Sequence, residues 1–138
     1  MTKSEILAFL NENHLCFLAT VEGNKPHVRG MDMFRGDENG LVFYTDKQKD
    51  VYKQIAKNPE VEICYPDAQK ETTVRVSGKM EILDDLEIKK EIVSKRPFLK
   101  PVAEQAGYDF MGVFRLKNGK ATVWSMQDMA APKTFVDL

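Results

Sequence analysis

The chain has few of the residues that build metal sites and thiol chemistry, with two histidines, two cysteines and one tryptophan in 138 residues. His14 and His27 stand in no ligand spacing with cysteine or carboxylate residues, so no metal site is predicted. Cys16 and Cys64 each lie inside an apolar, strand-like segment. That setting is typical of buried thiols rather than of a disulfide, a metal site or a nucleophile.

Long apolar runs and an excess of one charge are also missing. No run approaches the ~20 residues of a membrane span, and the polar N-terminus does not resemble a signal peptide, so we expect no membrane contact. The two thiols fit a reducing, cytoplasmic setting. The net charge of −1 gives no general attraction to nucleic acid. There is no Walker-type phosphate loop, no GxGxxG and no nucleophile elbow. The length predicts one domain spanning residues 1–138.

What is present is a series of short strand candidates separated by turn residues and amphipathic stretches. The strand candidates are 14–21, 27–34, 41–45, 61–65, 72–83, 108–116 and 120–126. The helix candidates are 2–13, 46–59 and 84–95, with 96–107 irregular or briefly helical and the tail 127–138 loose or docked on a neighbour.

These elements predict an α+β chain built on an antiparallel sheet of six or seven strands, closed as a small barrel with helices at its periphery. Two hairpins are expected, one joining 27–34 to 41–45 and one joining 108–116 to 120–126. Helix caps are also predicted: Thr2 with Glu5 forms a capping-box pattern, and Asp84 or Asp85 begins the helix that follows.

The junction "LVFYTDKQKD" is the segment with the clearest chemical character. If the first predicted hairpin forms, Arg29 lies close to Tyr44 and Thr45, where a helix from about Lys47 begins. A guanidinium, hydroxyl groups, the ammonium of Lys49 and free helix N–H groups are the components of a phosphate-binding site.

A second interpretation of the same segment stays open, namely a strand end followed by a solvated helix. Asp46 and Asp50 bracket Lys49, and carboxylates at a helix start would repel a phosphate. Three charge-assisted hydrogen bonds contribute about 5–9 kcal/mol, whereas micromolar binding needs about 8 kcal/mol. A ligand held there therefore needs an apolar part as well, as a phosphorylated planar cofactor has.

The segment "KPHVRGMDMFRGDENGLVFYTDKQKDVYKQIAKNP" resembles the pyridoxamine 5′-phosphate oxidase-like family of FMN-binding split barrels. The shared pattern is a Pro-x-x-Arg strand, a turn, a strand ending in Tyr-Thr, and a basic helix start that ends in Asn-Pro. "VRVSGKMEIL" and "DFMGVFRLKNGKATVWSM" also resemble strands of the family. The resemblance implies a split barrel, a homodimer and FMN bound at the subunit interface.

The resemblance also implies roles for individual residues. Arg29 would hold the flavin phosphate, and the backbone of Gly30 and Met31 would line the edge of the isoalloxazine. Tyr44 and Thr45 match the family's Tyr-Thr cofactor contact.

Two further positions follow from the resemblance. Trp124 falls at the tryptophan that lies near the flavin in the oxidase. Lys49 resembles the phosphate-binding basic residue, although the oxidase has its Arg-Lys pair one or two positions further along, which leaves Lys53 as a weaker substitute.

Departures from the oxidase bear on the reaction. Phe34 stands where the oxidase has a substrate-contacting lysine, and the tail "QDMAAPKTFVDL" has no Arg-x-His segment, so oxidation of pyridoxamine phosphate is not predicted. The chain resembles the general-stress and nitroimidazole-reductase-like branches of the family more closely.

Three functions follow as alternatives. The first is an FMN oxidoreductase that passes hydride or electrons from reduced nicotinamide, NAD(P)H, to a small-molecule substrate, with no catalytic side chain assigned. The second is a non-catalytic module that binds FMN, haem or a related ligand on the same barrel. The sequence leaves open whether a deazaflavin or haem replaces FMN. The third is a structural dimer with an empty cleft.

Overall fold

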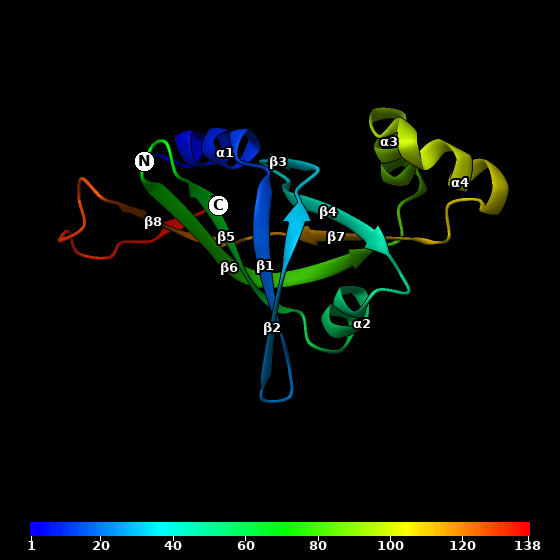
Figure 1. Ribbon diagram of the computed structural model, residues 1–138, viewed down its shortest axis with the longest axis horizontal. Coiled ribbons are helices and arrows are strands. Elements are labelled where there is room, and N and C mark those ends of the chain that lie inside the picture. The colour runs from blue at the N-terminus through cyan, green and yellow to red at the C-terminus, as the bar shows by residue number, and fades with distance from the viewer.

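Antiparallel strands dominate the computed structural model, which describes residues Met1 to Leu138 (Figure 1). The strands are β1 (Leu15–Glu22), β2 (Lys25–Asp32), β3 (Arg35–Asp37), β4 (Gly40–Asp46), β5 (Glu60–Asp67), β6 (Thr72–Leu83), β7 (Met111–Leu116), β8 (Lys120–Ser125) and β9 (Val136–Asp137). The helices are α1 (Lys3–Glu12), α2 (Asp50–Lys57), α3 (Leu86–Lys95), the 3-10 turn η1 (Pro97–Leu99) and α4 (Lys100–Ala106). The predicted α+β class is confirmed.

The sheet order is β2-β1-β5-β6-β7-β4-β3, with β8 added to β6 and β9 added to β8. The long strand β6 belongs to both parts of the barrel. Its first half, from Thr72 to Ser77, pairs with β8, whereas its second half, from Met80 to Leu83, pairs with β7. One strand thus joins the two parts of the predicted split barrel.

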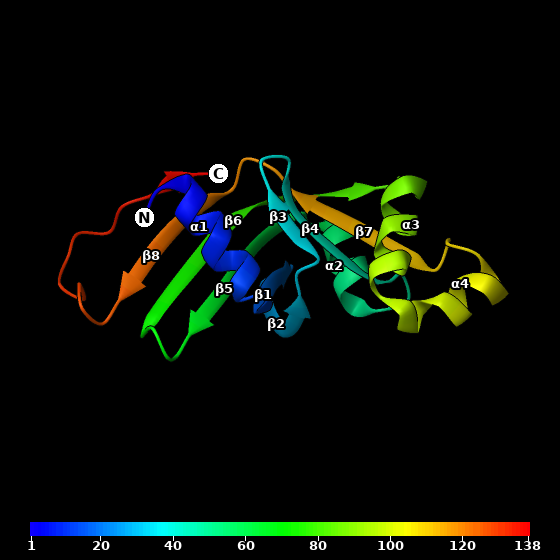
Figure 2. The ribbon, with the colours of Figure 1, turned by 90° about the horizontal axis from the view of Figure 1, so that it is seen from above.

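The main core lies between the inner face of the strands and the helices α1 and α2. Ile6 and Leu10 of α1 and Val51 and Ile55 of α2 are buried there together with apolar residues of β1, β4, β5, β6 and β7. Figure 2 shows α1 lying over β5 and β6. Helix α2 is held against β1 and β4, so its first turn lies near the end of β4.

A smaller core lies under α3, η1 and α4, which together we call the helical arm. Ile92, Val93 and Ala103 of the arm pack with Val42 of β4 and Val113 of β7. The arm stands at one end of the molecule and the loop before β9 at the other (Figures 1 and 2). No helix has the length and apolar character that crossing a bilayer requires.

Both predicted hairpins are wrong, although all seven predicted strands are present. The strand at 27–34 pairs with β1 through an Asn24 turn, and β4 pairs instead with the short strand β3 and with β7. Strand β8 pairs with β6 rather than with β7. The sheet has nine strands rather than six or seven because the two short strands β3 and β9 are added at its ends.

The predicted helix caps are confirmed. Thr2 Oγ1 accepts a hydrogen bond from the Glu5 N–H, and the Glu5 carboxylate accepts one from the Thr2 N–H. Asp85 rather than Asp84 caps α3 by accepting from the first-turn N–H groups. Helix α2 begins at Asp50, later than the predicted Lys47, because residues 47–49 form a turn.

Candidate cofactor cleft

Two adjoining hollows form a cleft between β2, the end of β4, the start of α2 and the helical arm. The first, which we call the polar hollow, has a volume of about 570 Å³ and is lined mainly from β2 and α2. The second, the apolar hollow, has a volume of about 420 Å³ and is bounded on one side by the arm. Four lining residues belong to both hollows: Gly30, Met31, Thr45 and Lys49.

Arg29 is held at the base of the polar hollow by a hydrogen-bond network. Its Nη1 donates to the Leu18 carbonyl at 3.2 Å and to Thr20 Oγ1 at 2.9 Å, and its Nη2 donates to Gln54 Oε1 at 2.5 Å. Thr20 Oγ1 also donates to Gln54 Oε1 at 2.6 Å, and both side chains are buried. The guanidinium is therefore fixed by β1 and α2 rather than directed into bulk solvent.

This network leaves Arg29 able to bind an anion. A guanidinium has five N–H donors, and three hydrogen bonds to protein atoms leave two donors for a ligand. Burial lowers the pKa of Arg29 from its usual value, and the carboxylate of Asp50 acts in the opposite direction. An arginine nonetheless keeps its charge at neutral pH, so the hollow has a permanent cation at its base.

The start of α2 adds further donors. Lys49 occupies the N-cap position, and no side chain there accepts a hydrogen bond from the first turn. The first N–H groups of a helix have no partner within the helix, so an anion in the hollow can accept from them. The Asp50 carboxylate lines the same hollow and opposes an anion, but Arg29 and Lys49 leave the lining cationic.

Tyr44 faces the apolar hollow rather than the polar one. Its ring meets that of Phe34 edge to face, with centroids 6.5 Å apart. Burial raises the pKa of Tyr44 above its usual value, while the nearby Arg96 guanidinium acts in the opposite direction. The Tyr44 hydroxyl therefore keeps its proton at neutral pH and can serve as a hydrogen-bond donor.

The wall of the apolar hollow comes from the arm and from the segment before β7. Phe98, Leu99 and Val102 of the arm line it together with Phe110. Phe98 is 68% exposed and Val102 is 43% exposed. A flat apolar ligand would remove these side chains from water, and that burial contributes favourably to binding.

The structure brings most of the predicted site residues together. Arg29, Gly30, Met31, Thr45 and Lys49 all line the polar hollow, although the hairpin expected to place them does not form. Lys53, the weaker substitute for Lys49, is not part of either lining.

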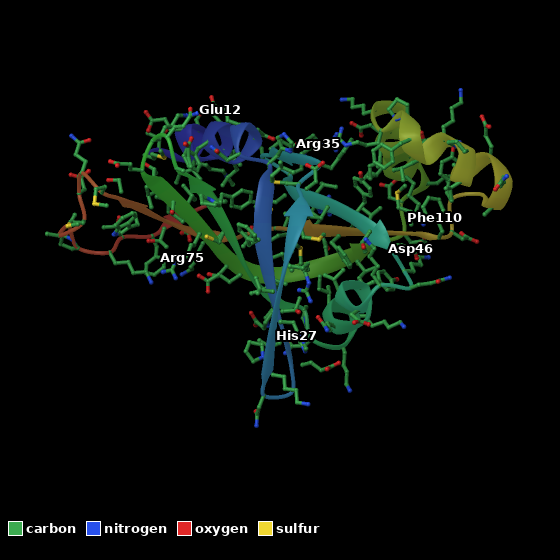
Figure 3. All side chains as sticks on the ribbon, viewed as in Figure 1. Glu12, His27, Arg35, Asp46, Arg75 and Phe110 are labelled. Carbon is green, nitrogen blue, oxygen red and sulfur yellow. The ribbon has the colours of Figure 1, made fainter.

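Trp124 is placed apart from the other predicted site residues. Within one chain it lines a different hollow, together with Arg75 and residues of the C-terminal loop. Figure 3 shows Arg75 and Asp46, which lines the apolar hollow, on opposite sides of β1 and β2. The contact between Trp124 and a flavin therefore stays a prediction.

The sequence analysis missed two residues that hold Arg29: Gln54, which lines the polar hollow, and Thr20, which lies behind it. Gln54 falls on the buried face of α2 between Val51 and Ile55, and Thr20 has the same strand parity as the buried Cys16 and Leu18. Each is a polar residue at a position where the pattern of the helix or strand predicts a buried apolar one, and this was the signal that could have identified it. Such a residue needs a buried hydrogen-bond partner, and here the shared partner is Arg29.

Comparison with known proteins identifies the family. A split barrel with a cationic hollow beside its second strand is the class of protein that the fold and site define. Residues 2–123 match the family described as pyridoxamine 5′-phosphate oxidase. The chain belongs to this family.

Among curated relatives, general stress protein 26 of Bacillus subtilis (strain 168) is 33% identical over 99 residues, which cover 68% of this chain and 69% of that protein. The pyridoxine/pyridoxamine 5′-phosphate oxidase of Shewanella denitrificans is 28% identical over 95 residues, which cover 69% of this chain. The chain spans only 45% of that oxidase's length.

Solved structures agree with the fold. A NimC/NimA family protein from Clostridium acetobutylicum superposes with a TM-score of 0.80 at 27% identity, covering 98% of this chain and 92% of that chain. A pyridoxamine 5′-phosphate oxidase-related, FMN-binding protein from Nostoc punctiforme has a TM-score of 0.64 at 16% identity, covering 99% of this chain and 96% of that chain. At that identity, the likeness concerns the fold alone.

Proposed function

We propose that the protein binds FMN in the cleft between β2, α2 and the helical arm and acts as an oxidoreductase on a small molecule. The observation that carries this proposal is the union of a cationic hollow, built around Arg29, with an apolar hollow bounded by Phe98 and Phe110. A phosphorylated flavin has the same two parts. Membership of the family and the FMN-binding protein of the same fold support it.

The residues present fit the phosphate end of FMN. Two donors of Arg29 and the ammonium of Lys49 can make three charge-assisted hydrogen bonds, together worth about 5–9 kcal/mol. Micromolar binding needs about 8 kcal/mol. The polar hollow alone therefore comes close to this value, and the apolar hollow supplies the remainder by burial.

Bound FMN would supply the hydride and electron chemistry, with reduced nicotinamide as the donor. The protein's own residues would bind and orient the cofactor. The buried Thr20 and Gln54 hold Arg29 in place, and the arm forms one wall of the apolar hollow. Because the Tyr44 hydroxyl keeps its proton, it can donate a hydrogen bond to a ligand in the apolar hollow.

The absorption spectrum of the purified protein tests the binding proposal. We expect the visible bands of a flavin, either as purified or after addition of FMN. A protein that stays colourless after incubation with FMN and gel filtration would contradict it. Adding NADH or NADPH in the absence of oxygen then tests the redox function: bleaching is expected, whereas a bound flavin that neither nucleotide reduces would indicate a non-catalytic binding module.

We also propose that the protein is a homodimer. The outward face of the sheet carries Phe17, which is 50% exposed, and Val28, which is 69% exposed. By strand register, Phe17 of β1 lies on the same face as Trp124 of β8, through Cys64 and Arg75. Exposed apolar residues sharing one face are typical of a protein–protein interface. A second copy on this face would cover Phe17 and Val28.

Sedimentation velocity tests the dimer. The wild-type chain should sediment as a dimer, and Val28→Glu should shift it toward monomer because an unpaired carboxylate would be buried at the interface. Lys25→Glu, on the same strand, is the matched control. A wild-type monomer at micromolar concentration would contradict the proposal. A reducing, cytoplasmic location remains a prediction from the two free cysteines.

A further inference from the structure

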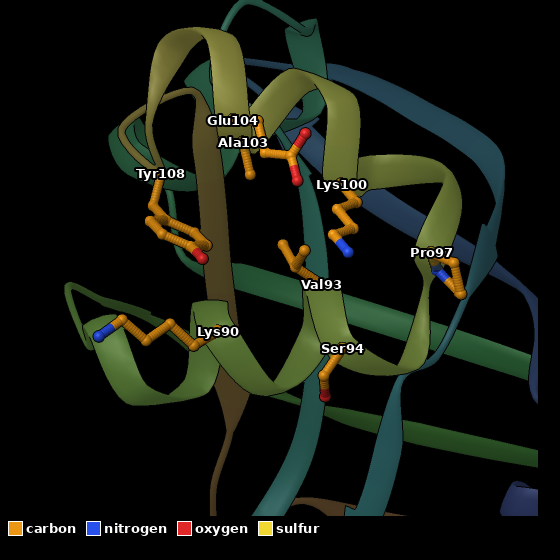
Figure 4. Close-up of a pocket in the computed structure, with 8 residues that line it drawn as sticks. All are labelled: Lys90, Val93, Ser94, Pro97, Lys100, Ala103, Glu104 and Tyr108. Atoms are coloured by element: carbon orange, nitrogen blue, oxygen red, sulfur yellow. The ribbon is translucent and has the colours of Figure 1, made fainter.

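A third hollow lies within the helical arm, apart from the cofactor cleft. It has a volume of about 550 Å³ and opens between α3 and α4. Figure 4 shows Val93 on α3 facing Ala103 and the ring of Tyr108, with Lys100 and Glu104 projecting from α4 toward the same space. None of its lining residues lines either part of the cofactor cleft.

The floor of this arm hollow is apolar and already packed. Val93 and Ala103 are buried members of the smaller core, and Tyr108 packs against that core from the side. The floor is therefore present before any ligand arrives, which lowers the cost of binding. The exposed edge of this floor can contact a small apolar ligand, and the Tyr108 ring can stack against an aromatic ring of that ligand.

The three charged side chains that line the arm hollow form no ion pairs, unlike two neighbouring lysines on α3. Lys89 and Lys95 on α3 lie within ion-pair distance of Asp84 and Glu91, respectively. Lys90 and Lys100, which line the hollow, have no carboxylate within 4.0 Å, and Glu104 has no cation within that distance.

Lys100 and Glu104 stand one helical turn apart, at a spacing that favours pairing on an isolated helix. The two side chains nonetheless form no ion pair. The lining thus has two free ammonium groups against one carboxylate, an excess of positive charge above an apolar floor.

We propose that the arm hollow binds a small monocarboxylate with a compact apolar or aromatic body. The carboxylate would lie at the ammonium of Lys100, with Lys90 adding to the positive field, and the body would rest on Val93, Ala103 and the ring of Tyr108. Charge-assisted hydrogen bonds to the ligand carboxylate and burial of its body act together. Glu104 selects against a second negative charge. This proposal does not depend on the identity of the ligand in the cofactor cleft.

Benzoate is the probe for this site. The full-length protein, saturated with FMN if it binds FMN, is titrated with benzoate and followed by amide chemical shifts. We expect saturable shifts around Val93 and Ala103, with a dissociation constant on the order of 1 mM for so small a molecule. Phenethylammonium, a cation of similar size, should produce at least about fivefold weaker binding because it meets two ammonium groups.

Variants distinguish a specific binding site from non-specific electrostatic attraction. Lys100→Met should weaken benzoate binding about fivefold, and Glu104→Gln should strengthen it about twofold. Lys95→Met is the matched control, since Lys95 belongs to the same arm but does not line the hollow, and it should leave the affinity unchanged. Lysine-to-methionine changes at exposed positions keep the chain folded, which the amide spectrum checks directly.

Three results would overturn the proposal. The first is the absence of saturation at Val93 and Ala103. The second is equal loss of affinity in Lys100→Met and Lys95→Met, which would indicate a diffuse charge effect. The third is a set of shifts confined to the surroundings of Tyr44 and Phe110, which would place the probe in the cofactor cleft instead.

Discussion

The two halves of the cofactor cleft are built in opposite ways. In the polar half, Arg29 is tied by three hydrogen bonds to β1 and to the buried Thr20 and Gln54. In the apolar half, Phe98 and Val102 belong to the arm and remain exposed to water. The position of the anion-binding group is thus fixed by folding, whereas the apolar wall is completed only when something covers it. The two halves should respond differently to substitution.

The largest effect on FMN binding is expected from the loss of Arg29 in the polar half. Arg29→Ala removes the two donors left for a phosphate, each worth about 1.5–3 kcal/mol, so the dissociation constant for FMN should rise at least about 100-fold. Arg115→Ala is the control, because its guanidinium pairs with Glu81 at 2.6 Å outside the cleft. Isothermal titration with FMN measures both. Similar constants for the two variants would rule out the assigned role of Arg29.

A second substitution tests how tightly the polar half is supported. A Cβ atom at Gly112 of β7 would lie 2.4 Å from the Tyr52 ring of α2, which packs on Phe114 with centroids 5.6 Å apart. Gly112→Ala must displace that ring and should lower the free energy of unfolding by about 1–3 kcal/mol. Urea unfolding measures it. Gly30→Ala, whose Cβ would meet nothing within 4 Å, should lose little stability. A loss as small in Gly112→Ala would show that α2 moves to accommodate the new methyl group.

Alkaline pH tests the packing beside strand β2, whose Gly30 and Met31 line both hollows. Cys16 of β1 lies opposite Met31 of β2 and donates a hydrogen bond to its carbonyl at 3.5 Å, and burial raises the pKa of this thiol from 9.0 to about 12. Above about pH 9 the unfolded chain therefore releases a proton that the folded chain keeps, so stability falls as the pH rises. This thiol should remove about 1.4 kcal/mol of stability between about pH 7 and about pH 10.

Urea unfolding at both pH values measures this effect in the wild-type chain and in Cys16→Ala. The difference between the two pH values should be smaller in the variant by about that amount, because the other titrating groups are common to both proteins. The same pH dependence in both proteins would mean that the Cys16 thiol ionises as readily in the folded chain as in the unfolded one.

The smallest effect is expected in the apolar half. Phe98→Ala should weaken FMN binding about fivefold through lost burial of roughly 1 kcal/mol, while changing the free energy of unfolding by less than about 0.5 kcal/mol. Leu86→Ala removes another exposed side chain, which belongs to α3 and lies outside the cleft. Fluorescence titration with FMN compares the two. A large loss of stability in Phe98→Ala would show that the wall is already part of the core.

The strands of this fold can be predicted from the sequence, but their partners cannot. Alternating apolar residues in β1 and β6 report that each has a buried face, which is a local property. Pairing joins segments far apart in the chain, as when β4 pairs with β7 instead of β2. The length of β6 carries a hint, because twelve residues exceed what one partner of six residues can cover.

The candidate site could be predicted only in part for a similar reason. Arg29 lies within β2, Thr45 near the end of the apolar strand β4 and Lys49 just before α2, and the structure brings these three residues to one hollow. Gln54 and Thr20 matter because α2 packs on β1, a contact that no short window of sequence contains. The arm's contribution depends on where α3, η1 and α4 are held by the smaller core, which is equally non-local.

Strand β6 has a consequence for how the chain comes apart. Because β8 pairs with its first half and β7 with its second, neither portion of the sheet can detach without unzipping a strand that the other portion also needs. Loss of structure should thus spread from end to end in one cooperative event. Amide hydrogens in the middle of this strand should exchange last, on the timescale of global opening.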